Sequence, residues 1–217
     1  MEVERHRRWQ LEEVMNSLTH GVGLALSAAG MAVLVTLAAM RGSGWHIVAC
    51  SLYGTSLLLL YAASTLYHAS RKSSVRKVLQ KFDHAAIYVL IAGTYTPIVL
   101  VNMRGGWGWT LFGLVWGFAV AGIVFKVLFA GRFTLVSTVL YLGMGWLVVI
   151  ALNPLVRALP DLGLLLLLLG GLAYSIGCVF YLKDAKPFRH FAWHLFVLAG
   201  SVFHYFAILV SVVPGKA

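Results

Sequence analysis

Charged residues are scarce in this chain, and acidic residues are the scarcest. Charged residues make up 11% of the 217 residues, with 7 Asp and Glu against 17 Lys and Arg. Hydrophobic residues make up 60%. No soluble domain of this size needs such a composition, so the soluble globular class is excluded. The composition predicts a protein that crosses a bilayer several times.

Cysteine is also rare, and the net charge is one-sided. Cys50 and Cys178, the only two cysteines, lie in apolar stretches, so neither a disulfide framework nor a redox compartment is predicted. A formal charge of +10 suggests nucleic acid in a soluble protein, but in a membrane protein it indicates loops that face an anionic inner leaflet. We expect membrane lipids as partners and no nucleic acid. The oligomeric state stays open.

Apolar runs predict an all-α membrane protein with a seven-transmembrane helix bundle. Residues 1–15 are expected to form a cytoplasmic segment, and residues 16–213 the bundle. The basic stretch 69–82 predicts a short helix on the membrane surface. Pro154 and Pro160 predict a loop at 153–162. The expected spans are residues 16–40, 45–68, 83–101, 110–129, 134–152, 163–182 and 190–213.

The distribution of Lys and Arg predicts the orientation. The N-terminus and the connections after spans two, four and six carry thirteen of them, whereas the other side carries Arg41, Arg104, Arg157 and Lys216. This asymmetry predicts a cytoplasmic N-terminus and an outside C-terminus, in a multi-pass protein of the cell inner (plasma) membrane. It argues against a G-protein-coupled receptor. The last span has no lysine for a Schiff base, which argues against a retinal protein.

The last span carries three histidines, although ionisable residues inside a membrane are costly and usually functional. His190 and His194 are four residues apart, so they share one helix face about 6 Å apart along the axis. His204 lies about 15 Å deeper. In the predicted orientation span two ends inside with Ser64 and His68, and span three begins inside with Asp83. These residues therefore meet at one level of one leaflet.

Three imidazoles with an open fourth position are the ligands expected of a catalytic zinc site. We predict His68, His190 and His194 as the ligands of a zinc ion. Zinc in such a site activates water and polarises carbonyl groups. Asp83 is predicted to orient or deprotonate the water, and Ser64, one helical turn before His68, to donate to a developing oxyanion or to hold a ligand.

Each residue alone also has a plainer interpretation. His68 suits an interfacial polar residue at a helix end, Asp83 an acid at a helix N-terminus, and the His190–His194 pair two interfacial side chains. Their convergence on one leaflet favours the metal site. Of the other histidines, His84 is interpreted as a helix-end polar group, and His20 as a neighbour or hydrogen-bond partner of the ligands. His204 is interpreted as a buried hydrogen-bonded residue, with a role in lining a pocket as the alternative.

The spaced set of Ser64, His68, Asp83, His190 and His194 resembles the bacterial hemolysin III proteins. These belong to the progestin and adipoQ receptor (PAQR) family, in a superfamily that includes alkaline ceramidases. The stretches 16–21 (NSLTHG) and 64–68 (STLYH) are also similar to hemolysin III sequences. The resemblance covers the whole seven-span core. It implies a cytoplasmic N-terminus, a zinc ion held by the three histidines, and Asp83 close to a zinc-bound water.

Three functional hypotheses follow. The first is a zinc-dependent, ceramidase-like hydrolase that cleaves the C–N bond of a lipid amide, or a related lipid acyl bond, in membrane-lipid homeostasis. The second is a non-enzymatic sensor or receptor-like regulator of membrane state, with zinc as a clamp between helices. The third is a pore-forming cytolysin, which a chain that looks like a permanent membrane resident disfavours.

Overall fold

The computed structural model describes residues 2–129, 132–183 and 187–213, and they are almost entirely helical. Two of the seven long segments are not uniform α-helices. A π-helical turn, η1, continues α3, and a 3-10 turn, η2, links α5 to α6. The elements are α1 (Glu2–Arg41), α2 (Gly44–Ala69), α3 (Ser73–Pro97), η1 (Ile98–Asn102), α4 (Gly106–Leu128), α5 (Thr134–Gly145), η2 (Leu147–Ala151), α6 (Leu152–Ala158), α7 (Asp161–Leu182) and α8 (Arg189–Val212).

Seven helical segments of the described chain are long and apolar enough to cross a membrane. The prediction of seven apolar helices is therefore confirmed, and a multi-pass membrane protein follows. Leucine and valine side chains such as Leu165 and Leu168 face outward, whereas the largest fully buried side chains include Tyr53, Tyr61 and Tyr88. The polar part of the protein is thus inside the bundle. The orientation in the membrane stays a prediction.

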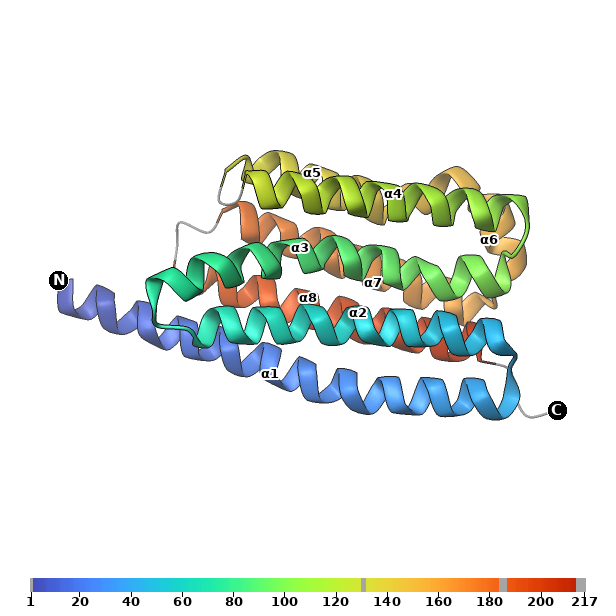
Figure 1. The fold of residues 1–217 in the computed structure, drawn as a ribbon, viewed down its shortest axis with the longest axis horizontal. Helices are drawn as coiled ribbons and strands as arrows, with labels where there is room; N and C mark the ends of the chain where they lie inside the picture. The colour runs from blue at the N-terminus through green and yellow to red at the C-terminus, as the bar shows by residue number, and fades with distance from the viewer. Residues whose placement is uncertain (1, 130–131, 184–186, 214–217) are drawn as a thin grey trace.

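The helices form a ring that the last helix closes. In chain order α1 contacts α2, α2 contacts α3, and α3 contacts α4; α4 and α7 both contact α5, and α7 contacts α8. Helix α8 also contacts α1, as the red and blue ribbons show (Figure 1). The start of α8 therefore lies near the end of α2, although more than 100 residues separate them in the sequence.

Two expected boundaries differ from the structure. The basic stretch 69–82 is not a separate surface helix, because α3 begins at Ser73 and runs through Asp83 without interruption. No proline or glycine stands between Ser73 and Gly93 to end it. The expected loop 153–162 contains α6 (Leu152–Ala158), since Pro154 lies in its first turn, where a missing backbone N–H costs little.

The expected fifth span is broken at Gly145, and Tyr95 of α3 binds the break. The Tyr95 hydroxyl donates to the carbonyl oxygens of Met144 at 3.0 Å and Gly145 at 2.7 Å. It also accepts the N–H of Val148 at 2.9 Å. Unpaired backbone groups at membrane depth need such partners. The break therefore depends on a contact with α3 that the local sequence does not reveal.

Helix α1 begins at Glu2, so the expected cytoplasmic segment and the first span are one continuous helix. The residues before the apolar run therefore continue along the axis of the first span. Of the short polar loop expected between spans six and seven, residues 184–186 lie outside the described part of the chain.

Helix α4 offers a matched test of close packing. A methyl group on Gly108 would collide with the backbone carbonyl oxygens of Val99 and Met103, whereas one on Gly113 would meet nothing within 4 Å. We expect Gly108→Ala to lower the free energy of unfolding by about 1–3 kcal/mol, because backbone atoms cannot move aside as a side chain can.

The control Gly113→Ala is expected to leave stability unchanged or to raise it by about 0.5–1 kcal/mol. Thermal unfolding of both variants in the same detergent measures the difference. Equal melting temperatures for the two variants would contradict the close approach of α4 to the turn before it.

Candidate metal centre

Three histidines from two helices meet at one end of the bundle. His190 and His194 lie on one face of the first two turns of α8, and His68 lies in the last turn of α2. The ring centroids are 5.2 Å apart for His68 and His190, 4.7 Å for His68 and His194, and 4.8 Å for His190 and His194. One ring nitrogen of each lies within 4.8 Å of the others. This group can hold one metal ion.

The burial of the group fits a metal ion as its missing partner. His68 and His194 are 5% and 2% exposed. Nε2 of His68 and Nδ1 of His194 are buried without a hydrogen bond. Leaving a buried polar atom unsatisfied costs about 1–3 kcal/mol, which a bound cation would remove. Three imidazole donors suit zinc. The identity of the metal stays a prediction.

His20 lies directly against this group. Its ring stacks on the His194 ring with centroids 3.7 Å apart and planes 16° apart, and Tyr61 packs against it edge-on at 5.1 Å. His20 is not a member of the ligand group among the described residues. The stacking agrees with the expectation that His20 is a neighbour of the ligands. It also limits how the His194 ring can turn.

Ser64 and Asp83 lie at the same end of the bundle as the three histidines. Both are buried, at 1% and 9% exposure. Together with His190 and His194 they line a cavity of about 110 Å³. The Ser64 hydroxyl oxygen has no hydrogen-bond partner. The structure therefore brings the predicted acid and hydroxyl to the wall of the cavity that the histidines border, and their catalytic roles stay predictions.

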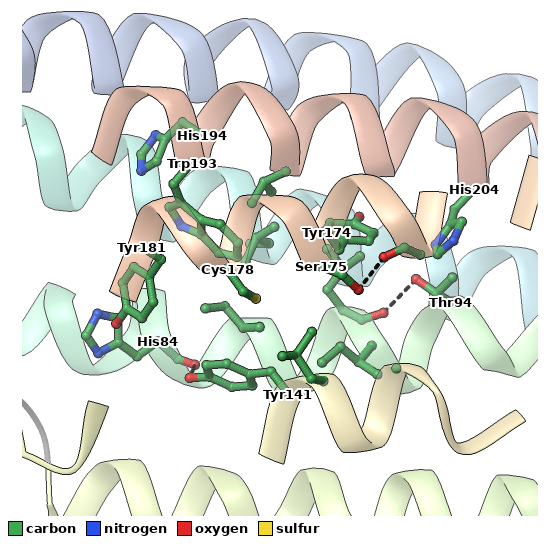
Figure 2. Close-up of a pocket in the computed structure, with 18 of the residues that line it drawn as sticks. His84, Thr94, Tyr141, Tyr174, Ser175, Cys178, Tyr181, Trp193, His194 and His204 are labelled. Carbon is green, nitrogen blue, oxygen red and sulfur yellow. Dashed lines mark hydrogen bonds between the residues drawn. The ribbon is translucent and has the colours of Figure 1, made fainter. Parts of the chain in front are cut away.

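The cavity continues through the bundle between α3, α5, α7 and α8. Figure 2 shows His194 at one end and His204 at the other, with Cys178 and Tyr174 between them. The walls are mainly apolar and aromatic. Because ten residues separate His194 from His204 on one helix, the distance along the axis is about 15 Å. A slender apolar ligand would fit this shape.

Two further histidines border the cavity. His204 is partly buried, and its Nε2–H donates to the carbonyl oxygen of Leu167 at 3.1 Å, so the prediction of a hydrogen-bonded residue is confirmed. His84 was interpreted as a helix-end polar group, but it also lines the cavity. Its carbonyl oxygen accepts a hydrogen bond from Tyr141 at 3.0 Å.

Glu13 lies outside the set of site residues that the sequence predicts, yet it is within hydrogen-bond distance of a ligand histidine. Oε2 of Glu13, on α1, lies 2.8 Å from Nδ1 of His68. Glu13, Asn16 and His20 are three and four residues apart, the spacing of one helix face. That spacing is a signal in the sequence, but Glu13 stands in the charged stretch before the apolar run, within the expected cytoplasmic segment 1–15.

The described geometry agrees with a comparison of the whole chain with known families. The family model described as haemolysin-III related matches residues 8–205. The chain belongs to the haemolysin-III-related family. Residue 8 precedes Glu13, and residue 205 follows His204, so all the residues discussed above fall inside the match.

Named relatives of this haemolysin-III-related protein span bacteria and mammals. Hemolysin-3 of Bacillus cereus is 45% identical over 203 residues, covering 94% of this chain and 93% of that protein. The Hemolysin-3 homolog of Bacillus subtilis is 48% identical over 198 residues, covering 91% and 93%. Monocyte to macrophage differentiation factor of Homo sapiens is 32% identical over 213 residues, covering 94% and 86%. The predicted resemblance is confirmed.

The ligand group predicts a metal content that depends on α8. We expect the purified protein to carry about one zinc ion per chain and His190→Ala/His194→Ala to carry essentially none, because a single remaining imidazole cannot hold the ion. The control is His46→Gln, at the opposite end of α2. Elemental analysis after desalting measures the metal. Full zinc content in the double variant would rule out this site.

Proposed function

We propose that this protein is a zinc-dependent hydrolase that cleaves a lipid amide, or a related lipid acyl bond, at the cytoplasmic leaflet of the cell membrane. The observation that carries the proposal is one shared cavity. His190 and His194 line one end of it together with Asp83 and Ser64, and His68 completes the histidine group beside them. Beyond them the cavity continues between apolar side chains of four helices. Such a cavity suits an acyl chain whose polar end stops at the histidines.

The number of ligands supports an enzyme over a clamp. Structural zinc sites are usually closed by four protein ligands, whereas catalytic sites keep one position open. Among the described residues the group has three members, His68, His190 and His194, and Asp83 is not one of them. Three histidine ligands are therefore consistent with a fourth coordination position that is open to water or to a substrate carbonyl oxygen.

Each polar side chain has a role in this hydrolysis. When bound, zinc supplies a Lewis acid that polarises the scissile carbonyl and lowers the pKa of a water. Asp83 accepts the proton of the attacking water and delivers it to the leaving amine as the C–N bond breaks. Ser64 donates its hydroxyl hydrogen to the carbonyl oxygen as negative charge develops there. The products are a fatty acid and an amine.

The surroundings of the site also favour a lipid substrate. The link from α2 to α3 and the start of α3 carry five basic residues between His68 and Asp83, namely Arg71, Lys72, Arg76, Lys77 and Lys81. Basic residues at this place attract anionic headgroups. A lipid would approach with its headgroup among these charges and its acyl chain toward the cavity.

The proposal predicts how two substitutions act on turnover. We expect Asp83→Asn to lower fatty-acid release by roughly 10²–10⁴-fold, because the proton acceptor is lost. Ser64→Ala is expected to lower it by about 10²–10³-fold through loss of one oxyanion donor. Both should keep their zinc, since neither residue belongs to the ligand group. The measurement is fatty-acid release from a panel of lipid amides and esters, with zinc content on the same samples.

His46→Gln is again the matched control and should hydrolyse as the wild type does. Bound zinc without any fatty-acid release across the panel would contradict the hydrolase and favour a zinc-stabilised sensor of membrane state. Discrete conductance in a planar bilayer that survives His190→Ala/His194→Ala would instead favour the pore.

A further inference from the structure

The two ring nitrogens of His68 have different surroundings. Nδ1 lies 2.8 Å from Oε2 of Glu13, whereas Nε2 is buried and has no hydrogen bond. An ionised carboxylate can only accept, so Nδ1 must carry the hydrogen. In neutral imidazole this leaves a lone pair on Nε2. His68 is therefore set in the form that can offer Nε2 to a cation.

Glu13 is itself held by a cation from a third helix. Nη2 of Arg76, in the first turn of α3, lies 2.6 Å from Oε1 of Glu13. The two carboxylate oxygens thus have separate partners, Arg76 on one side and His68 on the other. The pair is largely shielded, with 15% of the Glu13 side chain and 20% of the Arg76 side chain exposed.

Arg76 has several contacts that fix its position. Its guanidinium lies 4.4 Å from the Tyr67 ring centroid and 5.6 Å from that of Trp9. Nη1 lies 3.4 Å from the carbonyl oxygens of Tyr67 and Ser70. Aromatic faces and carbonyl oxygens both favour a guanidinium. The arrangement therefore links α1, the end of α2 and the start of α3 around one histidine.

We infer that Glu13, held in place by Arg76, is a positioning residue of the metal centre, which fixes the tautomer and the orientation of the His68 ring. The inference rests on the proposed metal site. Histidines that ligate metals usually donate their other N–H to a carboxylate or a carbonyl, and loss of that partner typically costs 10–100-fold in metal affinity. Glu13 has the required acceptor at the required nitrogen.

The competing explanation is a simple ion pair that joins α1 to α3. Removing such a pair would lower stability without changing His68. The exposed pair of Arg8 and Glu4 on the same helix is an example of a contact with no neighbouring ligand. Two measurements distinguish the explanations: the tautomer of the His68 ring and the affinity of the site for a metal ion.

The first experiment uses the metal-free protein. We expect ¹⁵N-histidine NMR of the wild type to show the His68 ring protonated at Nδ1, with the signal assigned by His68→Ala. Glu13→Ala is expected to give a mixture of tautomers, because the acceptor is gone. Glu12→Ala removes the same charge from the neighbouring position of α1 and should match the wild type. An unchanged His68 spectrum in Glu13→Ala would overturn the inference.

The second experiment measures affinity. Zinc competition with a chelator is expected to show roughly 10–100-fold weaker binding in Glu13→Ala, with Glu12→Ala equal to the wild type. Cobalt, as a probe metal, should give a changed ligand-field spectrum only in the Glu13 variant. If Glu13→Ala does not fold, Glu13→Gln replaces it, since one amide oxygen cannot serve both Arg76 and His68.

The outcomes separate this inference from the proposed function. Equal affinity in the Glu13 and Glu12 variants, even with a lower melting temperature for the former, would reduce Glu13 to an ion pair and leave the metal centre standing. Absence of metal from the wild type would instead defeat the metal centre, and the tautomer measurement on the metal-free protein would still decide the role of Glu13.

Discussion

Burial of imidazole nitrogens in an apolar bundle is the constraint on which the rest of this structure depends. A buried histidine nitrogen needs a partner, because leaving it unpaired in an apolar bundle costs free energy. His68 and His194 each keep one nitrogen without a hydrogen bond. Their positions follow from the closure of the helix ring, in which α8 returns to α1 beside the end of α2. The same closure defines the cavity that leads away from the histidines.

The helices that form the site also form its interior space. Tyr95 lines the cavity and at the same time binds the free backbone groups where α5 breaks. His194 faces the metal group on one side and stacks on His20 on the other. Glu13 and Arg76 extend this arrangement to the surface. Most of these side chains have more than one contact, so the site is a connected polar region inside an apolar shell.

The sequence predicted the parts that depend on local pattern. Apolar runs located the seven helices, and the four-residue spacing of His190 and His194 placed both on one face. Contacts between segments that are distant in the sequence could not be predicted from such local patterns. The Tyr95 hydrogen bonds and the contact of Glu13 with His68 each join residues far apart in the chain. His20 was expected beside the ligands, but no sequence spacing predicts that its ring stacks on that of His194. The sequence predicts a separate surface helix at 69–82, because its basic residues suit a membrane surface, whereas the structure has one continuous α3. It predicts a loop at 153–162 from the two prolines, although Pro154 lies where a helix tolerates it.

X-ray absorption at the zinc edge of the purified protein tests the central claim most directly. The account predicts about three nitrogen scatterers at roughly 2.0–2.1 Å with the multiple-scattering pattern of imidazole, and one further oxygen at a similar distance. A thiolate shell at about 2.3 Å would place the metal elsewhere, since zinc–sulfur bonds have that length. The same shell of nitrogens in His190→Ala/His194→Ala would equally contradict the account.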